Sequence, residues 1–219
     1  MAPSAPDMRV LSCLFLTKTS KLVPAALELF AQSGYLGTSM SDIAKQLGLT
    51  KAALYKHFPS KQAILDQIVS HMNQLDEQRA RDYQMPLARD SGAAQAYLLA
   101  PAEEIRTYTL AQFAHWTQDP FSAAFRRVLT LAQYHDRSLS QLFQTYLASG
   151  PTKYMAEVFQ GLTGDADLGA QLALEFYGPI YLLYALYDGA EDKPAVLATL
   201  NSHIDRFISR VESIRAANS

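Results

Sequence analysis

The sequence contains few of the residues that signal covalent cross-links or membrane insertion. Its 219 residues include one cysteine, Cys13, so no disulfide can form within the chain, and this cysteine content is typical of a reducing cytoplasm. No apolar run approaches the roughly 20 residues that a helix needs to cross a bilayer. Glycine and proline, at 10 residues each, are not enriched. We therefore expect a cytoplasmic globular protein with no membrane partner.

Signatures of catalysis and of metal binding are also missing. The five histidines are scattered, without the spacing that places two of them on one helix face as zinc ligands. The sequence has no Gly-x-Ser-x-Gly element, no P-loop and no glycine-rich dinucleotide fingerprint. We therefore expect no enzymatic activity, no catalytic residue, no metal and no cofactor.

The charged residues are few and unevenly distributed. The formal net charge of -2 argues, taken alone, against a nucleic-acid-binding protein. Residues 1–61, however, carry seven basic and three acidic side chains, a net charge of +4, whereas the remainder carries 12 basic and 18 acidic ones, a net charge of -6. A basic N-terminal module on an acidic body fits local attraction to phosphates. Ordinary scatter of surface lysines is the alternative explanation.

The stretch from Thr38 to Lys61 has the pattern of two short helices joined by a tight turn. Ser39 occupies the N-cap position of the first helix, and Asp42 follows at the spacing of a capping box. Gly48 comes where a left-handed residue ends such a helix. Apolar residues at helical spacing form the stripe that we expect to be buried: Met40, Ile43, Ala44 and Leu47.

The second of these helices begins at Thr50, a good N-cap residue, and is stopped by Pro59. Leu54 and Phe58 share one face, which we expect to pack inward. The opposite face then exposes Lys51, Ala52, Tyr55 and Lys56. A small N-terminal turn with basic and aromatic residues beside it suits entry into the major groove.

From Leu22 to Leu65 the sequence resembles the tetracycline-repressor (TetR) family of bacterial regulators. The matching pieces, in order, are AxxLF, G-x-x-x-T-S, I-A-x-x-x-G and L-Y-x-H-F-x-x-K. Ala52 replaces a common glycine and Thr50 a common serine, but both are small. Pro24 also departs from the pattern; with Ser20 as N-cap of a first helix over about 22–33, it would lie at the edge of the first turn.

This resemblance implies a three-helix DNA-binding domain over residues 18–65, preceded by an N-terminal extension (1–17) and followed by a helical ligand-binding and dimerisation domain (66–219). Within the DNA-binding domain, we expect Tyr55 and Lys56 to contact DNA phosphates, and Lys51 and Ala52 to contact base edges. The full set of expected DNA-binding residues is Thr38, Ser39, Thr50, Lys51, Ala52, Ala53, Tyr55, Lys56, His57 and Lys61.

The rest of the chain is predicted to be all-α, because no segment alternates with a period of two for long and 49% of the residues are apolar. A fourth helix is expected from Lys61 to about Tyr83. Further helices are expected at about 93–99, 102–118, 121–134, 138–148, 151–162, 167–187 and 193–214. By resemblance to the family, the last two pair with their copies in a homodimer.

Aromatic residues concentrate in this helical body, where 15 of the 23 lie between Tyr108 and Tyr187. Such a body suits an apolar pocket for a small-molecule effector, although core packing and dimer contact explain aromatic residues equally well. His115, beside a tryptophan, offers a polar group that could face a cavity. The residues expected to line a pocket are Phe113, Trp116, Phe125, Tyr134, Tyr154, Phe176, Tyr177 and Tyr181.

Together these features favour a ligand-responsive transcriptional regulator, a repressor that binds a palindromic double-stranded DNA operator as a homodimer and is released by a small molecule. Two alternatives remain. One is a helical small-molecule-binding protein without DNA-binding activity, and the other is a transcriptional activator of the same family. The pattern of residues does not identify the effector.

Overall fold

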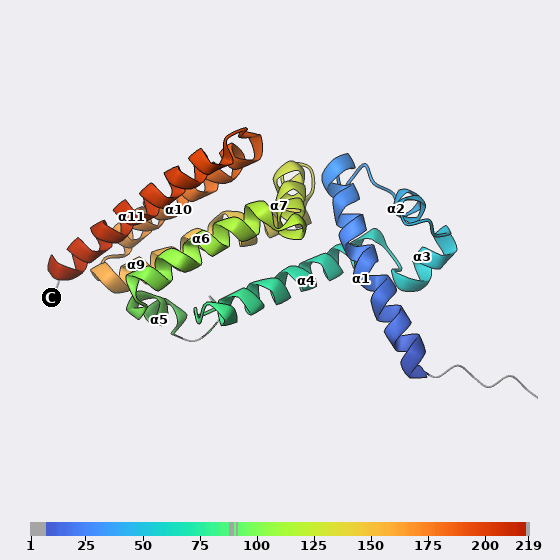
Figure 1. Cartoon of the computed structure of the whole chain (residues 1–219), viewed down its shortest axis with the longest axis horizontal. Coiled ribbons are helices and arrows are strands. Elements are labelled where there is room, and N and C mark those ends of the chain that lie inside the picture. The colour runs from blue at the N-terminus through green and yellow to red at the C-terminus, as the bar shows by residue number, and fades with distance from the viewer. Residues whose placement is uncertain (1–7, 88–89, 91, 218–219) are drawn as a thin grey trace, which may run out of the picture. The chain divides into compact units, whose positions relative to one another are not determined.

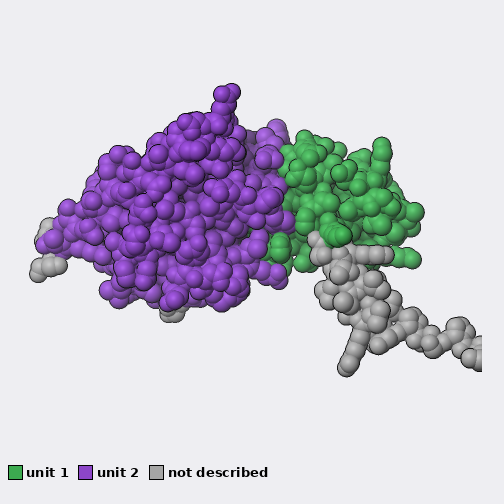
Figure 2. Space-filling model, viewed as in Figure 1, with its two compact units in different colours: residues 1–73 green, residues 74–219 purple. Residues whose placement is uncertain are grey.

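The computed structural model describes residues 8–87, 90 and 92–217, and every regular element in these ranges is a helix (Figure 1). The all-α prediction is confirmed. The chain forms two compact units, residues 1–73 and 74–219 (Figure 2). The first unit contains α1 (Met8–Ser33), α2 (Met40–Gln46), α3 (Lys51–His57) and the first part of α4 (Lys61–Asp82).

Helix α1 begins at Met8, so the expectation of a first helix that starts near Leu22 was wrong. Pro24 consequently lies well inside the helix instead of in its first turn. Residues 8–23 contain neither glycine nor proline, so no local signal stops the helix, and an interior proline removes only one of its hydrogen bonds. Gly34, with φ +79°, ends α1 as expected.

The predicted caps of α2 and α3 are confirmed. Ser39 and Asp42 form a reciprocal capping box, in which the Asp42 carboxylate accepts from the Ser39 amide at 2.8 Å. The Thr50 hydroxyl accepts from the Ala53 amide at 3.1 Å. Between the helices, Gly48 has φ +63°, a conformation that a side chain would strain. Local hydrogen bonds thus define where both helices begin and how the turn between them is made.

Lys61, the first residue of α4, ties this helix to the connection between α1 and α2. Its ammonium group donates to the carbonyl oxygens of Tyr35 at 2.6 Å and Thr38 at 2.9 Å. The same Nζ lies 4.4 Å from the centre of the Tyr35 ring. Tyr35 in turn packs edge-on against Phe30 of α1. A cation, two carbonyl groups and an aromatic ring therefore hold three segments of the first unit together.

The apolar core of the first unit continues into α4, where Ile64, Leu65, Ile68 and Met72 are buried. This explains why the compact units divide after Asn73, later in the sequence than the expected boundary after Leu65. The α4 residues from Gln74 onward belong to the second unit.

The second unit consists of the end of α4 and the helices that follow. These are α5 (Ala93–Leu99), α6 (Ala102–Gln118), α7 (Pro120–Ala132), α8 (Arg137–Leu147), α9 (Ser149–Thr163), α10 (Ala166–Gly189) and α11 (Lys193–Ala217). Each corresponds to a predicted helix, with ends that differ by a few residues. Helix α10 continues through Gly178 and Pro179 without interruption.

Helices α9 and α10 approach each other closely at Gly169. A Cβ atom at this position would lie 2.7 Å from the Gln160 amide nitrogen and 2.9 Å from the Ala156 carbonyl oxygen. Beyond them, α10 and α11 lie side by side and run in opposite directions (Figure 1). Among the described helices, none combines the length and apolarity that a bilayer crossing requires.

The contacts of Lys61 predict that Lys61→Met destabilises the first unit. The substitution keeps the length of the aliphatic stem but leaves two carbonyl groups without their charged donor, at a cost of about 1.5–3 kcal/mol. Urea unfolding followed by circular dichroism should show this loss. Lys45→Met removes an exposed lysine from the neighbouring helix α2 and is the matched control. Equal stability of the two variants would contradict this role for Lys61.

Candidate functional site

Helix α3 presents a small, basic surface to solvent. Lys51, Ala52 and Lys56 are exposed, and Tyr55 is 43% exposed although it is a large aromatic residue. On the opposite face Leu54 is fully buried and anchors the helix. The predicted division of α3 into an inner and an outer face therefore corresponds to the structure.

The charged side chains of α3 are all basic. The helix contains no acidic residue, and Lys56 and His57 occupy its last turn. The Lys51 ammonium group lies 5.9 Å from the centre of the Tyr55 ring, so the two outward side chains are neighbours. Because the N-terminal turn bears only short side chains apart from Lys51, its backbone can approach a groove closely. This surface suits contact with a polyanion.

Two residues expected to bind DNA are directed inward instead. Thr38 is 2% exposed, and its hydroxyl donates to the Gly34 carbonyl at 2.7 Å. The Lys61 ammonium group is held by the two carbonyl groups described above. We therefore assign both residues to the stability of the first unit, and their contact with DNA stays a prediction. Sequence pattern placed them near the turn but could not show their direction.

The remaining members of the expected DNA-binding set contribute mainly through capping or lie at the edge of the surface. Ser39 is exposed, but its hydroxyl is engaged with Asp42 at 2.6 Å. Thr50 is exposed and caps α3. Ala53 and His57 are half-buried. The side chains that the structure leaves most available are thus Lys51, Tyr55 and Lys56.

The second unit contains a partly open cavity of about 40 Å³ among α5, α6, α9, α10 and α11. Its lining is almost entirely apolar and includes Val158, Phe159, Phe176 and Phe207. Of the eight residues expected to line a pocket, Phe176 alone belongs to this lining. The cavity lies between residues that are far apart in the sequence.

The other expected pocket residues have different surroundings. Phe113 and Phe125 are fully buried and Trp116 is 7% exposed, so these three pack within the core. Tyr154 and Tyr177 are half-buried, and each hydroxyl donates to a backbone carbonyl. At the surface, Tyr134 is 83% exposed and Tyr181 36% exposed. The structure thus distributes these residues over the core, the surface and one cavity.

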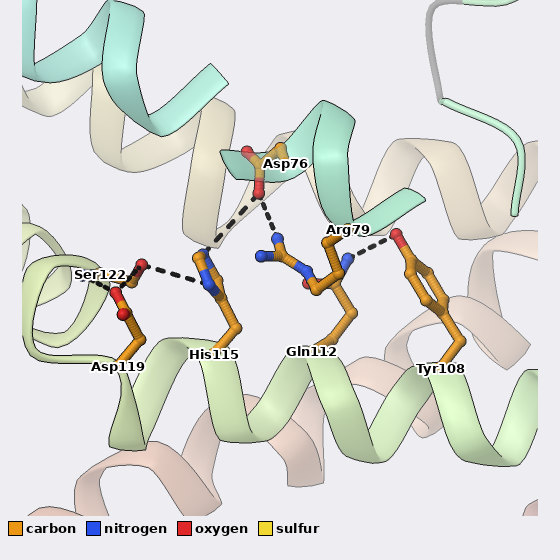
Figure 3. Close-up of polar contacts among 7 residues, drawn as sticks. All are labelled: Asp76, Arg79, Tyr108, Gln112, His115, Asp119 and Ser122. Atoms are coloured by element: carbon orange, nitrogen blue, oxygen red, sulfur yellow. Dashed lines mark hydrogen bonds and ion pairs between the residues drawn. The ribbon is translucent and has the colours of Figure 1, made fainter. Parts of the chain in front are cut away.

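A buried polar cluster joins the end of α4 to α6 (Figure 3). Arg79 is 9% exposed, pairs with Asp76 on its own helix, and donates from Nε to the Gln112 side-chain oxygen at 2.8 Å. Gln112 then donates to the Tyr108 hydroxyl at 2.7 Å. Burial raises the pKa of Asp76, whereas the Arg79 guanidinium opposes that rise. The cluster therefore connects two helices through one buried cation.

His115 lies beside this cluster in its neutral form. Burial, together with the nearby Arg79 charge, lowers its pKa to about 3. Its Nδ1 is 3.2 Å from the Ser122 hydroxyl, which itself donates to Asp119 at 2.7 Å, so Nδ1 carries the proton. The other nitrogen, Nε2, is buried without a hydrogen-bond partner, 3.9 Å from an Asp76 carboxylate oxygen (Figure 3).

The pattern of the sequence indicated His115 but not the charged residues around it. On α4, Asp76 and Arg79 continue the apolar stripe that includes Met72, at the spacing of one helix face. Charged residues on an otherwise apolar stripe were the available signal. Arg126 on α7 is similarly buried, at 5% exposure, and pairs with Asp188 at 2.7 Å. Its partner is 62 residues away, so no local pattern indicated the pair.

The neutral state of His115 predicts acid sensitivity of the second unit. Below about pH 6.5 the unfolded chain binds a proton at this position that the folded chain does not, so the free energy of unfolding falls. Between pH 7 and about pH 5 this contribution reaches at most about 2 kcal/mol. At lower pH the raised pKa of Asp76 opposes the trend, because the folded carboxyl group then binds its proton first.

His115→Gln should therefore weaken the pH dependence over that interval. Urea unfolding followed by the fluorescence of Trp116, the sole tryptophan and the neighbour of His115, measures it. His135→Gln, which changes an exposed histidine, serves as the control and should leave the dependence as it is. An unaltered dependence in His115→Gln would contradict the neutral, buried state.

Part of the sequence is similar to a known protein family and to characterised regulators. Residues 22–68 match the family described as bacterial regulatory proteins, tetR family. The biofilm operon icaADBC HTH-type negative transcriptional regulator IcaR of Staphylococcus aureus is 47% identical over 49 residues. This match covers 22% of the present chain and 26% of IcaR, so the two proteins are similar over only a part of each.

Solved structures resemble nearly the whole chain, at low sequence identity. A TetR-family transcriptional regulator from Marinobacter aquaeolei has a TM-score of 0.58 at 18% identity, over 90% of this chain and 98% of that one. The flavonoid-responsive regulator FrrA has a TM-score of 0.51 at 23% identity, over 89% and 96%. These likenesses show a shared fold. The match to the tetR family of bacterial regulatory proteins is to residues 22–68, the region that contains α2 and α3.

Proposed function

We propose that the protein is a transcriptional repressor that binds a palindromic DNA operator as a homodimer and is released by a small molecule. The observation that carries this proposal is the outer face of α3, a basic surface on a capped helix that its buried leucine holds in place. IcaR, which is similar over 49 residues, is described as a negative transcriptional regulator, and this favours repression over activation.

Within this function, the exposed residues of α3 have separate roles. Lys56 and Tyr55 are near the end of the helix, and we assign them to the phosphate backbone. Lys51 and Ala52 are in its first turn, where side chains reach base edges when a recognition helix enters the major groove. Phosphate contacts set affinity and its salt dependence, whereas base contacts set sequence preference.

An exposed apolar face of α10 supports dimerisation. Leu174, Leu182 and Leu186 are 63%, 59% and 51% exposed, and they lie on a stripe with the small residues Gly178 and Ala185. A contiguous apolar stripe on a helix surface is typical of an interface. Two chains related by a two-fold axis would present their α3 helices to successive major grooves, about 34–36 Å apart or somewhat wider.

Release by an effector requires a molecule that binds the two states of the protein with different affinity. The cavity in the second unit is a suitable place for such a molecule. FrrA, which shares the fold, is described as flavonoid-responsive, so this architecture is compatible with a small-molecule effector. A genomic operator selection with the full chain tests the proposal as a whole. Recovery of no specific sequence would favour the alternative of a ligand-binding protein without DNA-binding activity.

The assigned roles predict different effects for two lysines of α3. Lys56→Ala should weaken binding to all DNA sequences similarly and lower the slope of log affinity against log salt by up to about one. Lys51→Ala should change the preference among operator variants, by about 1–3 kcal/mol at the contacted base pair. Fluorescence anisotropy over a range of salt concentrations measures both.

Lys153→Ala, at an exposed position of α9, is the control for net charge and should leave both quantities unchanged. If Lys51→Ala instead weakened binding to all operator variants equally, we would conclude that Lys51 does not contact a base edge.

Leu182→Asp should convert the dimer into a monomer. A carboxylate on the apolar stripe would be desolvated without a partner in the interface, which disfavours association strongly. Analytical ultracentrifugation at micromolar concentration should show the change, together with at least a tenfold loss of operator affinity. Leu131→Asp, at a position of α7 that is 57% exposed, is the matched control and should remain dimeric. If Leu182→Asp remained a dimer, the dimer interface would lie on another surface.

A further inference from the structure

The ring of His115 carries a buried nitrogen that accepts no hydrogen bond. The side chain is 9% exposed, and no group in the described part of the chain donates to Nε2. Because the other nitrogen, Nδ1, donates its proton to the Ser122 hydroxyl, Nε2 is available only as an acceptor. Buried polar atoms without a partner are rare, because each has lost its hydration without replacement. A donor placed at this nitrogen would therefore be favourable.

The group that faces this nitrogen is the Asp76 carboxylate of α4, with one oxygen 3.9 Å away (Figure 3). An ionised carboxylate only accepts hydrogen bonds, so two acceptors face each other with no proton to join them. Asp76 pairs instead with Arg79, one turn further along its own helix. The Asp76 side chain is 31% exposed, so a proton from solvent can reach it. A single proton would satisfy both acceptors.

We propose that His115 and Asp76 share one proton at acidic pH and thereby form a pH-sensitive connection between α6 and α4. The proton enters from solvent, and the pair then holds one hydrogen bond between an Asp76 carboxylate oxygen and Nε2. No other bond is made, and the charge of Asp76, Arg79 and His115 together rises from zero to +1. A shift of about 1 Å brings the two atoms, now 3.9 Å apart, to an ordinary hydrogen-bond length.

The charges around the pair act on proton uptake in opposite directions. Burial raises the pKa of Asp76 and so favours uptake, whereas the Arg79 guanidinium opposes it. Burial and Arg79 both lower the pKa of His115, while the Asp119 carboxylate at the start of α7 partly offsets them. A proton shared between the two groups avoids the cost of a fully charged buried imidazolium. Arg79 is thus the cation against which the proton competes for Asp76.

The other titratable groups near the cluster do not compete for this proton. Burial raises the pKa of each neighbouring tyrosine, so all of them stay neutral as the pH falls: Tyr108 of α6, Tyr146 of α8 and Tyr184 of α10. On α7, Arg126 is paired with Asp188. We therefore expect the Asp76–His115 pair to be the part of the cluster that responds to mild acid.

The exchange of partners concerns the end of a helix that both units share. Helix α4 begins in the first unit at Lys61 and belongs to the second unit from Gln74 onward. In the neutral form Arg79 joins α4 to α6 through Gln112. In the acid form Asp76 adds a connection to α6, whereas Arg79 shares its carboxylate with the new proton. The attachment of α4 to α6 therefore depends on pH, whether or not the chain binds DNA.

The test is an NMR titration of the full chain, labelled with ¹⁵N in the histidine rings and ¹³C in the aspartate carboxyl groups. It covers the pH range in which circular dichroism shows native helix content. We expect the Asp76 carboxyl and His115 Nε2 signals, identified with Asp76→Asn and His115→Gln, to move with one common midpoint, because a shared proton titrates both groups together. Separate midpoints, or no change at either group before the chain unfolds, would overturn the inference.

A substitution of Arg79 supplies the second arm. Arg79→Met removes the cation that opposes proton uptake, so the common midpoint should rise by about one to three pH units. Arg81→Met removes an exposed arginine from the same helix and is the matched control, in which the midpoint should stay as it is. A midpoint that Arg79→Met leaves unchanged would contradict the exchange of partners.

The proton site and the proposed function can fail separately. A protein that selects an operator but shows separate midpoints for Asp76 and His115 would keep the function and lose the proton site. A common midpoint in a protein that selects no operator would do the reverse.

Discussion

The interaction on which the exposed face of α3 depends is the pair of hydrogen bonds from the Lys61 ammonium group to the Tyr35 and Thr38 carbonyl oxygens. It joins the start of α4 to the connection that leads from α1 to α2. The caps at Ser39 and Thr50 determine where α2 and α3 begin, but caps act within one turn and cannot orient helices in a unit. That orientation requires longer-range contacts, which Lys61 and the buried Leu54 supply.

The second unit combines two kinds of interior with different consequences. Between α4 and α6, the buried Arg79 is satisfied by one carboxylate and one amide, and such a charge is costly to leave unpaired. Between α9, α10 and α11, the interior is apolar and incompletely filled. The polar region has directional bonds that favour one arrangement of its helices. The apolar region relies on packing, with polar contacts such as that between His203 of α11 and the Phe176 carbonyl of α10 at 2.8 Å.

The sequence pattern was most informative where the governing interactions are local. Capping residues, the left-handed Gly48 and the apolar stripe of α2 depend on near neighbours in the sequence. The structure contains the caps and Gly48, and it buries all of the predicted stripe except Leu47, which is half-buried at the C-cap. The predicted start of α1 was wrong because Pro24 was given more weight than the uninterrupted helical run before it. Thr38 and Lys61 belong to the recognised motif, yet their direction is set by contacts with Gly34 and Tyr35.

The amino-acid sequence by itself determined the helical content, the two capped helices of the motif and the basic outer face of α3, because hydrogen bonds and periodicity along one helix are written in adjacent residues. Only the tertiary structure decided which aromatic residues line the cavity, that Arg126 pairs with Asp188, and that His115 is neutral. These properties depend on residues that are far apart in the sequence, 62 positions for Arg126 and Asp188, and that meet through packing. Burial then determines the protonation state of the buried groups.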